Sequence, residues 1–351
     1  MIQVLRGIAA SWVVLCHASE AGHIDSLKAS LPQWFDHVLF EMGHMGVAIF
    51  FALSGFVVAH SIHGDNVTPS YLGRFALRRS IRLDPPYWAA IAFAISLAIV
   101  SAKVKGETFV SPSAGQTLAH LTYTQTLLGY EQINLVFWTL CYEVQFYLVL
   151  VSAALVRHRG SQIVLFAMAL IWGMQLAPSP PGLFLGFWHT FFLGVLAYWS
   201  DESRTALIGL ALLSIGLIAS APDTFTFVAM LTAWFLWGMR RQGLMHLGSP
   251  PLLWLGAISY SLYLVHNPVT GAVSFVVRKM ELPEPAMLPL IVVGCLAVAG
   301  GMWFAIERPF QTLARRIRLG EPREIAPVPP SEHSDRREAM DRMHSIAGQR
   351  G

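Results

Sequence analysis

The feature that most constrains this chain is a series of apolar stretches long enough to cross a lipid bilayer. A helix needs about 20 predominantly apolar residues to span the hydrocarbon core. Only 13% of the residues are charged, whereas soluble domains carry about 25%. Strands of a membrane barrel would instead alternate apolar and polar residues in short segments. The sequence therefore predicts an all-α fold, a polytopic bundle of membrane-spanning helices.

About ten transmembrane helices are expected, with no additional soluble domain. Proline and glycine clusters such as PSPPG and GSPP separate several of them. The transmembrane domain should cover residues 1–310, and residues 311–351 should form a cytoplasmic tail with an amphipathic start and a disordered remainder. The predicted spans are residues 3–19, 44–63, 86–103, 134–156, 161–177, 182–199, 204–220, 224–239, 252–275 and 286–306.

The positions of Lys and Arg predict the orientation of these spans. Placing the N-terminus inside also places most arginines of the loops inside. The basic residues left outside are few: Lys28, Lys103, Lys105, Arg278 and Lys279. Both termini are therefore expected in the cytoplasm. The first apolar run has no small-residue cleavage site, so it should remain as the first helix.

Ionisable residues inside the predicted spans are the first candidates for function. LRGIAASWVVLCHA carries Arg6 and His17, which lie about three helical turns apart and share one face. Depth along their helices places His17, Glu143 and His266 at one level. Such groups are costly in lipid and usually face a bundle interior or a wet cavity. By contrast, His44 and His189 are better explained as hydrogen-bonded packing residues. His266 could also be a packing residue, with Tyr263 and Asn267 as its hydrogen-bond partners.

The segment YLGRFALRRSIRLDPPYW places four arginines just before the proline pair that starts the third predicted span. Arg74, Arg78 and Arg82 share one helical face, and Arg79 lies alongside. A basic anchor on the inner side explains such a cluster, but guanidinium groups also bind phosphates in a bidentate manner. Ser54 and Tyr260 lie at inner to middle depth, where they could line a passage from this cluster.

Metal and nucleic-acid chemistry are not indicated. The three cysteines each fall inside a predicted span, where cysteine behaves as a small apolar residue. No zinc spacing, phosphate-binding loop, dinucleotide-binding glycine pattern or nucleic-acid motif is present. We therefore expect no metal and no nucleic-acid partner.

Six motifs, in this order, give the chain a specific resemblance. LRGIAASWVVLCHA, GVAIFFALSGFVV, RRSIRLDPPYW, FWTLCYEVQFYLVL, LGAISYSLYLVHNPV and FAIERPF resemble those of the acyltransferase-3 family of bacterial membrane O-acyltransferases. The likeness runs from about residue 3 to about residue 310. The Arg and His of the first helix, separated by ten residues, are the family's signature and are here Arg6 and His17.

The resemblance implies transfer of an acyl group, usually acetyl from cytoplasmic acetyl-CoA, to a hydroxyl of a glycan or another acceptor. It implies His17 as the catalytic histidine, Arg6 as its companion and Glu143 as a buried acid. Arg78, Arg79 and Arg82 would contact the phosphates of CoA. The expected location is the bacterial inner membrane. Besides acyl-CoA, the acceptor and membrane lipid, a second copy of the chain or an envelope-glycan assembly protein is a possible partner.

Two mechanisms remain open at this point. His17 either deprotonates the acceptor hydroxyl for direct attack on the thioester or first accepts the acyl group itself. Ser54 and Tyr260 are expected at the acyl-CoA site and Tyr263 and His266 at the acceptor, and either tyrosine could meet the developing oxyanion. Two rival hypotheses are a proton-coupled transporter or exporter and a noncatalytic scaffold. The transporter is considered because a track of Arg, His and Glu also suits a proton path.

Overall fold

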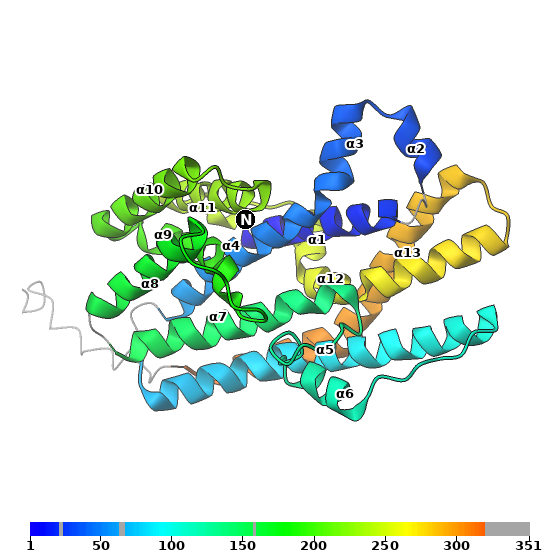
Figure 1. Ribbon diagram of the computed structural model, residues 1–351, viewed down its shortest axis with the longest axis horizontal. Helices are drawn as coiled ribbons and strands as arrows, with labels where there is room; N and C mark the ends of the chain where they lie inside the picture. The colour runs from blue at the N-terminus through cyan, green and yellow to red at the C-terminus, as the bar shows by residue number, and fades with distance from the viewer. Residues whose placement is uncertain (21–23, 63–66, 157–158, 320–351) are drawn as a thin grey trace, which may run out of the picture. The chain divides into compact units, whose positions relative to one another are not determined.

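In the computed structural model the chain is helical, and the described residues, 1–20, 24–62, 67–156 and 159–319, contain no strand. The all-α prediction is therefore confirmed, and Figure 1 shows the helices. The α-helices are α1 (Ile2–Ser19), α2 (Asp25–Ser30), α3 (Gln33–Leu39), α4 (Gly46–Ser61), α5 (Pro69–Lys105), α6 (Ala114–Leu121), α7 (Trp138–Leu155), α8 (Arg159–Gly173), α9 (Trp188–Trp199), α10 (Arg204–Ala219), α11 (Thr224–Arg241), α12 (Pro250–Lys279), α13 (Met287–Met302) and α14 (Arg308–Arg315).

A helix covers the main part of every predicted span, but fewer segments meet a strict criterion for crossing a membrane. By length and composition, five described segments are long and apolar enough: Ile2–Ser19, Gln33–Ser61, Pro69–Lys105, Leu135–Leu155 and Glu284–Arg315. The apolar helical segments Gly160–Gly173, Phe184–Trp199 and Arg204–Ala219 are shorter than a standard span. The protein is a polytopic helical membrane protein, while the count of ten spans stays a prediction.

Helix α5 differs from the sequence expectation. It begins at Pro69 rather than at the Pro85–Pro86 pair, and it runs on to Lys105 through both prolines. Its start is well specified, because the Thr68 side chain accepts a hydrogen bond from the backbone N–H of Tyr71 at 3.1 Å and proline suits the first helical turn. The arginine cluster and the third span therefore belong to one continuous helix.

Close helix packing at glycines holds the bundle together. Helices α4 and α9 lie side by side (Figure 1). A Cβ atom added at Gly55 would lie 1.8 Å from the backbone oxygen of Phe191, and one at Gly194 would lie 1.9 Å from that of Ala52. Small residues allow such approaches between membrane helices. These two glycines therefore set the distance between α4 and α9.

Helix α12 contains a proline whose missing N–H is compensated from another segment. Pro268 cannot donate to the carbonyl one turn before it, that of Leu264. The side-chain amide of Asn134 donates to this carbonyl at 3.1 Å. Asn134 also accepts a hydrogen bond of 3.2 Å from the Asn267 amide. The segment before α7 is thus tied to the middle of α12.

Residues Met1–Ile317 form one compact unit. Helix α14 lies within it and contacts α5, and Ala314 is buried. The predicted boundary at residue 310 remains an expectation. The predicted disorder of the tail concerns residues 320–351, which lie outside the described residues.

Candidate functional site

Five helices surround a small cavity that carries most of the predicted polar residues. Its free volume is about 70 Å³, enough for a phosphate or a few water molecules but not for a whole coenzyme. The polar residues lining it are Arg6 from α1, Ser54 from α4, Arg79 and Arg82 from α5, Thr139 and Glu143 from α7, and Ser259, Tyr260 and Tyr263 from α12. The fold thus places residues that are far apart in sequence around one cavity, which three arginines line.

Two arginines of the cavity, Arg79 and Arg6, make defined contacts. The guanidinium of Arg79 lies over the ring of Tyr147, 3.9 Å from its centroid, a cation–π arrangement. The Nε of Arg6 donates to the Ser259 hydroxyl at 3.2 Å. Arg82 lies in the electrostatic field of both Arg6 and Arg79. Three cations converge at this place, which favours an anionic ligand.

Arg78 is a different case. It is half-buried and, among the described residues, does not line the cavity. The resemblance groups it with Arg79 and Arg82 as a contact to CoA phosphates. Arg79 and Arg82 of α5 line the cavity instead. The third arginine that lines it is Arg6, from α1.

Glu143 supplies negative charge at the same cavity. The Ser54 hydroxyl donates to its Oε1 at 2.6 Å, so α4 and α7 are linked at the site. The carboxylate lies in the electrostatic field of Arg79. No hydrogen bond joins it to His17 among the described residues. The shared depth of the two residues therefore does not bring them into direct contact.

The two histidines predicted at one level do meet. The rings of His17 and His266 are edge to face with centroids 4.9 Å apart. His17 Nδ1 lies 3.0 Å from the carbonyl of Val13, and His266 Nδ1 lies 2.7 Å from that of Tyr263. When neutral, each ring therefore has a proton on Nδ1 and a lone pair on Nε2. His266 is completely buried, and its Nε2 has no hydrogen-bond partner among the described residues.

Tyr263 connects the histidine pair to the cavity. Its ring centroid lies 5.7 Å from that of His266, and the same side chain lines the cavity. Its hydroxyl donates to the backbone carbonyl of Val136 at 3.1 Å, and that of Tyr260 donates to the carbonyl of Leu83 at 3.1 Å. Both hydroxyl protons are therefore engaged before any substrate binds. His17 itself is not one of the described residues that line the cavity.

Sequence reasoning missed Glu307 as a site residue, although it lies in the motif FAIERPF. Only 1% of its surface is exposed. The backbone N–H and the hydroxyl of Ser261 donate to its Oε2 at 3.1 and 2.6 Å, and Gln311 donates to its Oε1 at 2.7 Å. It ends a π-helical turn, Trp303–Glu307, a distortion often found at functional sites. Glu307 also interacts electrostatically with Arg6 and Arg82.

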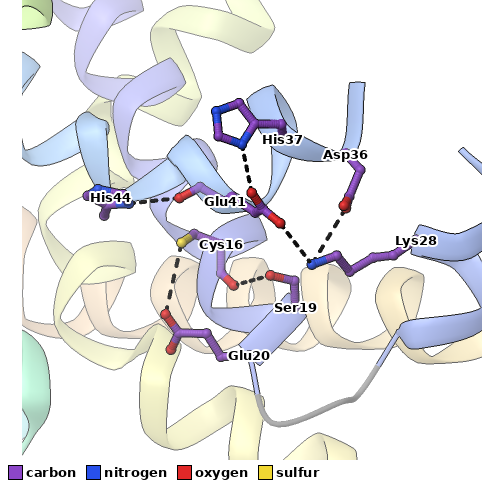
Figure 2. A network of polar contacts seen from close by, with 8 residues as sticks. All are labelled: Cys16, Ser19, Glu20, Lys28, Asp36, His37, Glu41 and His44. Carbon is purple, nitrogen blue, oxygen red and sulfur yellow. Dashed lines mark hydrogen bonds and ion pairs between the residues drawn. The ribbon is translucent and has the colours of Figure 1, made fainter. Parts of the chain in front are cut away.

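Figure 2 shows a network of polar contacts near Cys16 and Ser19, in the last turn of α1. The Lys28 ammonium lies 3.6 Å from Asp36 and 4.0 Å from Glu41, and Glu41 also contacts His37 at 2.6 Å. His44 Nδ1 lies 2.8 Å from the backbone oxygen of Glu41. His44 is thus a hydrogen-bonded structural residue, as is His189, whose Nε2 lies 2.8 Å from the Thr226 hydroxyl.

These features define a class: a polytopic helical membrane protein with a buried, arginine-rich cavity beside a pair of histidines. A family model described as an acyltransferase domain matches residues 2–306. The chain therefore belongs to the acyltransferase-3 family.

Two curated proteins from rhizobia are similar to the chain along most of its length. The exopolysaccharide production protein ExoZ of Rhizobium meliloti (strain 1021) is 26% identical over 312 residues, covering 80% of this chain and 94% of ExoZ. Nodulation protein 10 of Rhizobium leguminosarum bv. viciae is 27% identical over 372 residues, covering 90% of this chain and 95% of that protein. No solved structure matches the chain.

Proposed function

We propose that this acyltransferase moves an acetyl group from cytoplasmic acetyl-CoA to a hydroxyl of a cell-envelope or secreted glycan, as a multi-pass protein of the bacterial inner membrane. The observation that carries the proposal is the convergence of Arg6, Arg79 and Arg82 on one cavity, close to a histidine pair. The similarity to a protein named for exopolysaccharide production supports a glycan acceptor.

The arginines would bind the phosphates of CoA. Guanidinium groups form paired hydrogen bonds with phosphate oxygens, and the low polarity of the surroundings strengthens them. The cavity admits a phosphate but not a nucleotide, so the adenosine part of CoA would remain outside it. Ser54 and Tyr260 line the same cavity and would contact the bound donor.

His17 would act on the acceptor. With Nδ1 bonded to the carbonyl of Val13, its Nε2 can take the proton of the acceptor hydroxyl. The oxygen then attacks the thioester carbonyl, the carbon–sulfur bond breaks, and the CoA thiolate leaves and is protonated. In the alternative route Nε2 attacks the thioester first, and an acyl-imidazole carries the acetyl group to the acceptor. Tyr263 and His266 would contact the acceptor.

Radiolabelled acetyl-CoA and detergent-purified protein test this proposal. We expect thioester hydrolysis or transfer in the wild-type protein, and at least a hundredfold loss in His17→Ala, because general-base catalysis contributes about 10² to 10⁴. His44→Ala is the matched control, since His44 Nδ1 contacts the backbone oxygen of Glu41, three residues before it in the same helical turn. Full activity of His17→Ala at equal protein level would refute the role of His17. Substrate movement in vesicles without thioester consumption would instead indicate a carrier.

A further inference from the structure

A second, larger hollow lies between α5 and α12, with a volume of about 800 Å³. We call it the α5–α12 groove. Most of its lining is aliphatic or aromatic, and several rim residues, including Val100, Val104 and Val276, are exposed. Exposed apolar residues of a membrane protein face lipid chains rather than water. The groove is therefore a candidate site for an amphiphilic ligand.

Two matching rows of side chains run along the groove. On α12 the row is Asn267, Gly271, Ser274 and Arg278; on α5 it is Ala94, Ala98, Ser101 and Lys105. The spacing of four, three and four residues places each row on one helical face. In both rows a cation stands at the helix end and a hydroxyl lies one turn deeper, about 6 Å along the helix.

The charge of the groove has one sign. Lys105 and Arg278 line it, and no Asp or Glu does so among its described lining residues. In the orientation predicted from the sequence, Lys103, Lys105, Arg278 and Lys279 are four of the few basic residues on the outer side. Positive charge is expected to be sparse there. Its concentration at the ends of these two helices favours an anionic headgroup.

An independent observation points to a ligand inside the groove. Ser274 is 1% exposed and lines the groove, and its hydroxyl has no hydrogen-bond partner in the part of the chain that the structure describes. A buried polar group without a partner costs about 1 to 3 kcal/mol. In a phospholipid the ester carbonyls lie one glycerol unit below the phosphate, which corresponds to the turn that separates Ser274 from Arg278.

We propose that the α5–α12 groove binds an anionic diacyl phospholipid. Its phosphate lies between Lys105 and Arg278, and its ester carbonyls accept hydrogen bonds from Ser101 and Ser274. The acyl chains continue along the small residues Ala98 and Gly271 and their apolar neighbours. This site is separate from the arginine cavity and does not depend on the proposed acyl transfer.

Native mass spectrometry of the full chain in detergent, titrated with dioleoyl phosphatidylglycerol, tests the proposal. We expect wild-type protein to retain this lipid in preference to dioleoyl phosphatidylcholine. The double variant Lys105→Gln/Arg278→Gln should lose about thirtyfold in affinity, because each cation near an anionic lipid contributes about fivefold. Ser274→Ala, which removes only the hydroxyl, should lose about fivefold.

The matched control is the double variant Lys103→Gln/Lys279→Gln. It removes the same charge from the same two helices, but neither residue lines the groove. We expect it to bind phosphatidylglycerol within about threefold of wild type, as weak screened surface charges would. Equal losses in both double variants, or equal retention of the two lipids, would overturn the proposal. Displacement of the lipid by glycerol 3-phosphate would also overturn it, since the site would then recognise the phosphate alone.

Discussion

Replacing Gly55 by alanine tests how closely α4 and α9 must approach. The new Cβ would lie 1.8 Å from the carbonyl oxygen of Phe191, more than 1 Å inside the 3.0 Å that real Cβ atoms keep. The oxygen belongs to the backbone, so a side-chain rotation cannot relieve the clash, and the two helices must move apart. Overpacking of this kind lowers the free energy of unfolding by about 1 to 3 kcal/mol, occasionally more. We expect Gly55→Ala to lower it by about 3 kcal/mol.

Gly73 offers a matched control for that substitution. It lies within α5, and a Cβ added there would meet no atom of the described residues within 4 Å. Alanine favours a helix over glycine by up to about 1 kcal/mol, so Gly73→Ala should be neutral or slightly stabilising. Unfolding can be followed through the reaction of a thiol dye with Cys16, Cys141 and Cys295, which are buried in the folded protein.

Gly55→Ala should also affect the functional site. Gly55 follows Ser54, whose hydroxyl contacts Glu143 at 2.6 Å, so a shift of α4 disturbs that hydrogen bond. We expect Gly55→Ala to lower both the free energy of unfolding in an SDS titration and the acetyl-CoA turnover of folded protein. Equal stability of Gly55→Ala and Gly73→Ala would refute the close approach of α4 and α9.

Three further predictions follow from particular contacts. Arg82→Lys should weaken CoA binding about tenfold in calorimetry, because a bidentate contact is lost, whereas Arg78→Lys should change it less than about twofold; equal effects would contradict the lining of the cavity. Asn134→Leu should lower the free energy of unfolding by about 1 to 3 kcal/mol, because the Leu264 carbonyl loses its donor, and an unchanged SDS titration would speak against that hydrogen bond. Burial lowers the pKa of His120, so its unfolded form takes up a proton first and this residue's contribution to stability falls as the pH drops below about 6.5. The melting temperature of wild type relative to that of His120→Gln should therefore fall between pH 7.5 and 5.5. A difference that stays constant over this range would contradict the prediction.

The sequence predicts the helices well and their rotation less well. Apolar length locates a helix, because hydrophobicity is a local property, and depth along the helices brings His17 and His266 to one level. Depth does not specify which way a side chain faces. Glu143 shares the level but turns to Ser54 and the arginines, and its orientation depends on how α7 packs against its neighbours.

The arginine cluster illustrates the same limit. Four-residue spacing groups Arg78 with Arg82, yet Arg79 accompanies Arg82 into the cavity. The ring of Tyr147, on α7, holds the Arg79 guanidinium there, and no local pattern in α5 announces that partner. Glu307 was missed for a similar reason. A glutamate beside an arginine at the end of an apolar run is typical of a membrane interface, and only the fold reveals its burial against Ser261.

The bond between Asn134 and the Leu264 carbonyl has a consequence for biosynthesis. A chain made from its N-terminus inserts α7 and the segment before it well ahead of α12. The asparagine precedes its acceptor by 130 residues, so the donor is already present when the proline-bearing helix leaves the ribosome. The Leu264 carbonyl, which Pro268 leaves without its usual donor in the helix, therefore finds that donor as soon as α12 packs into the bundle.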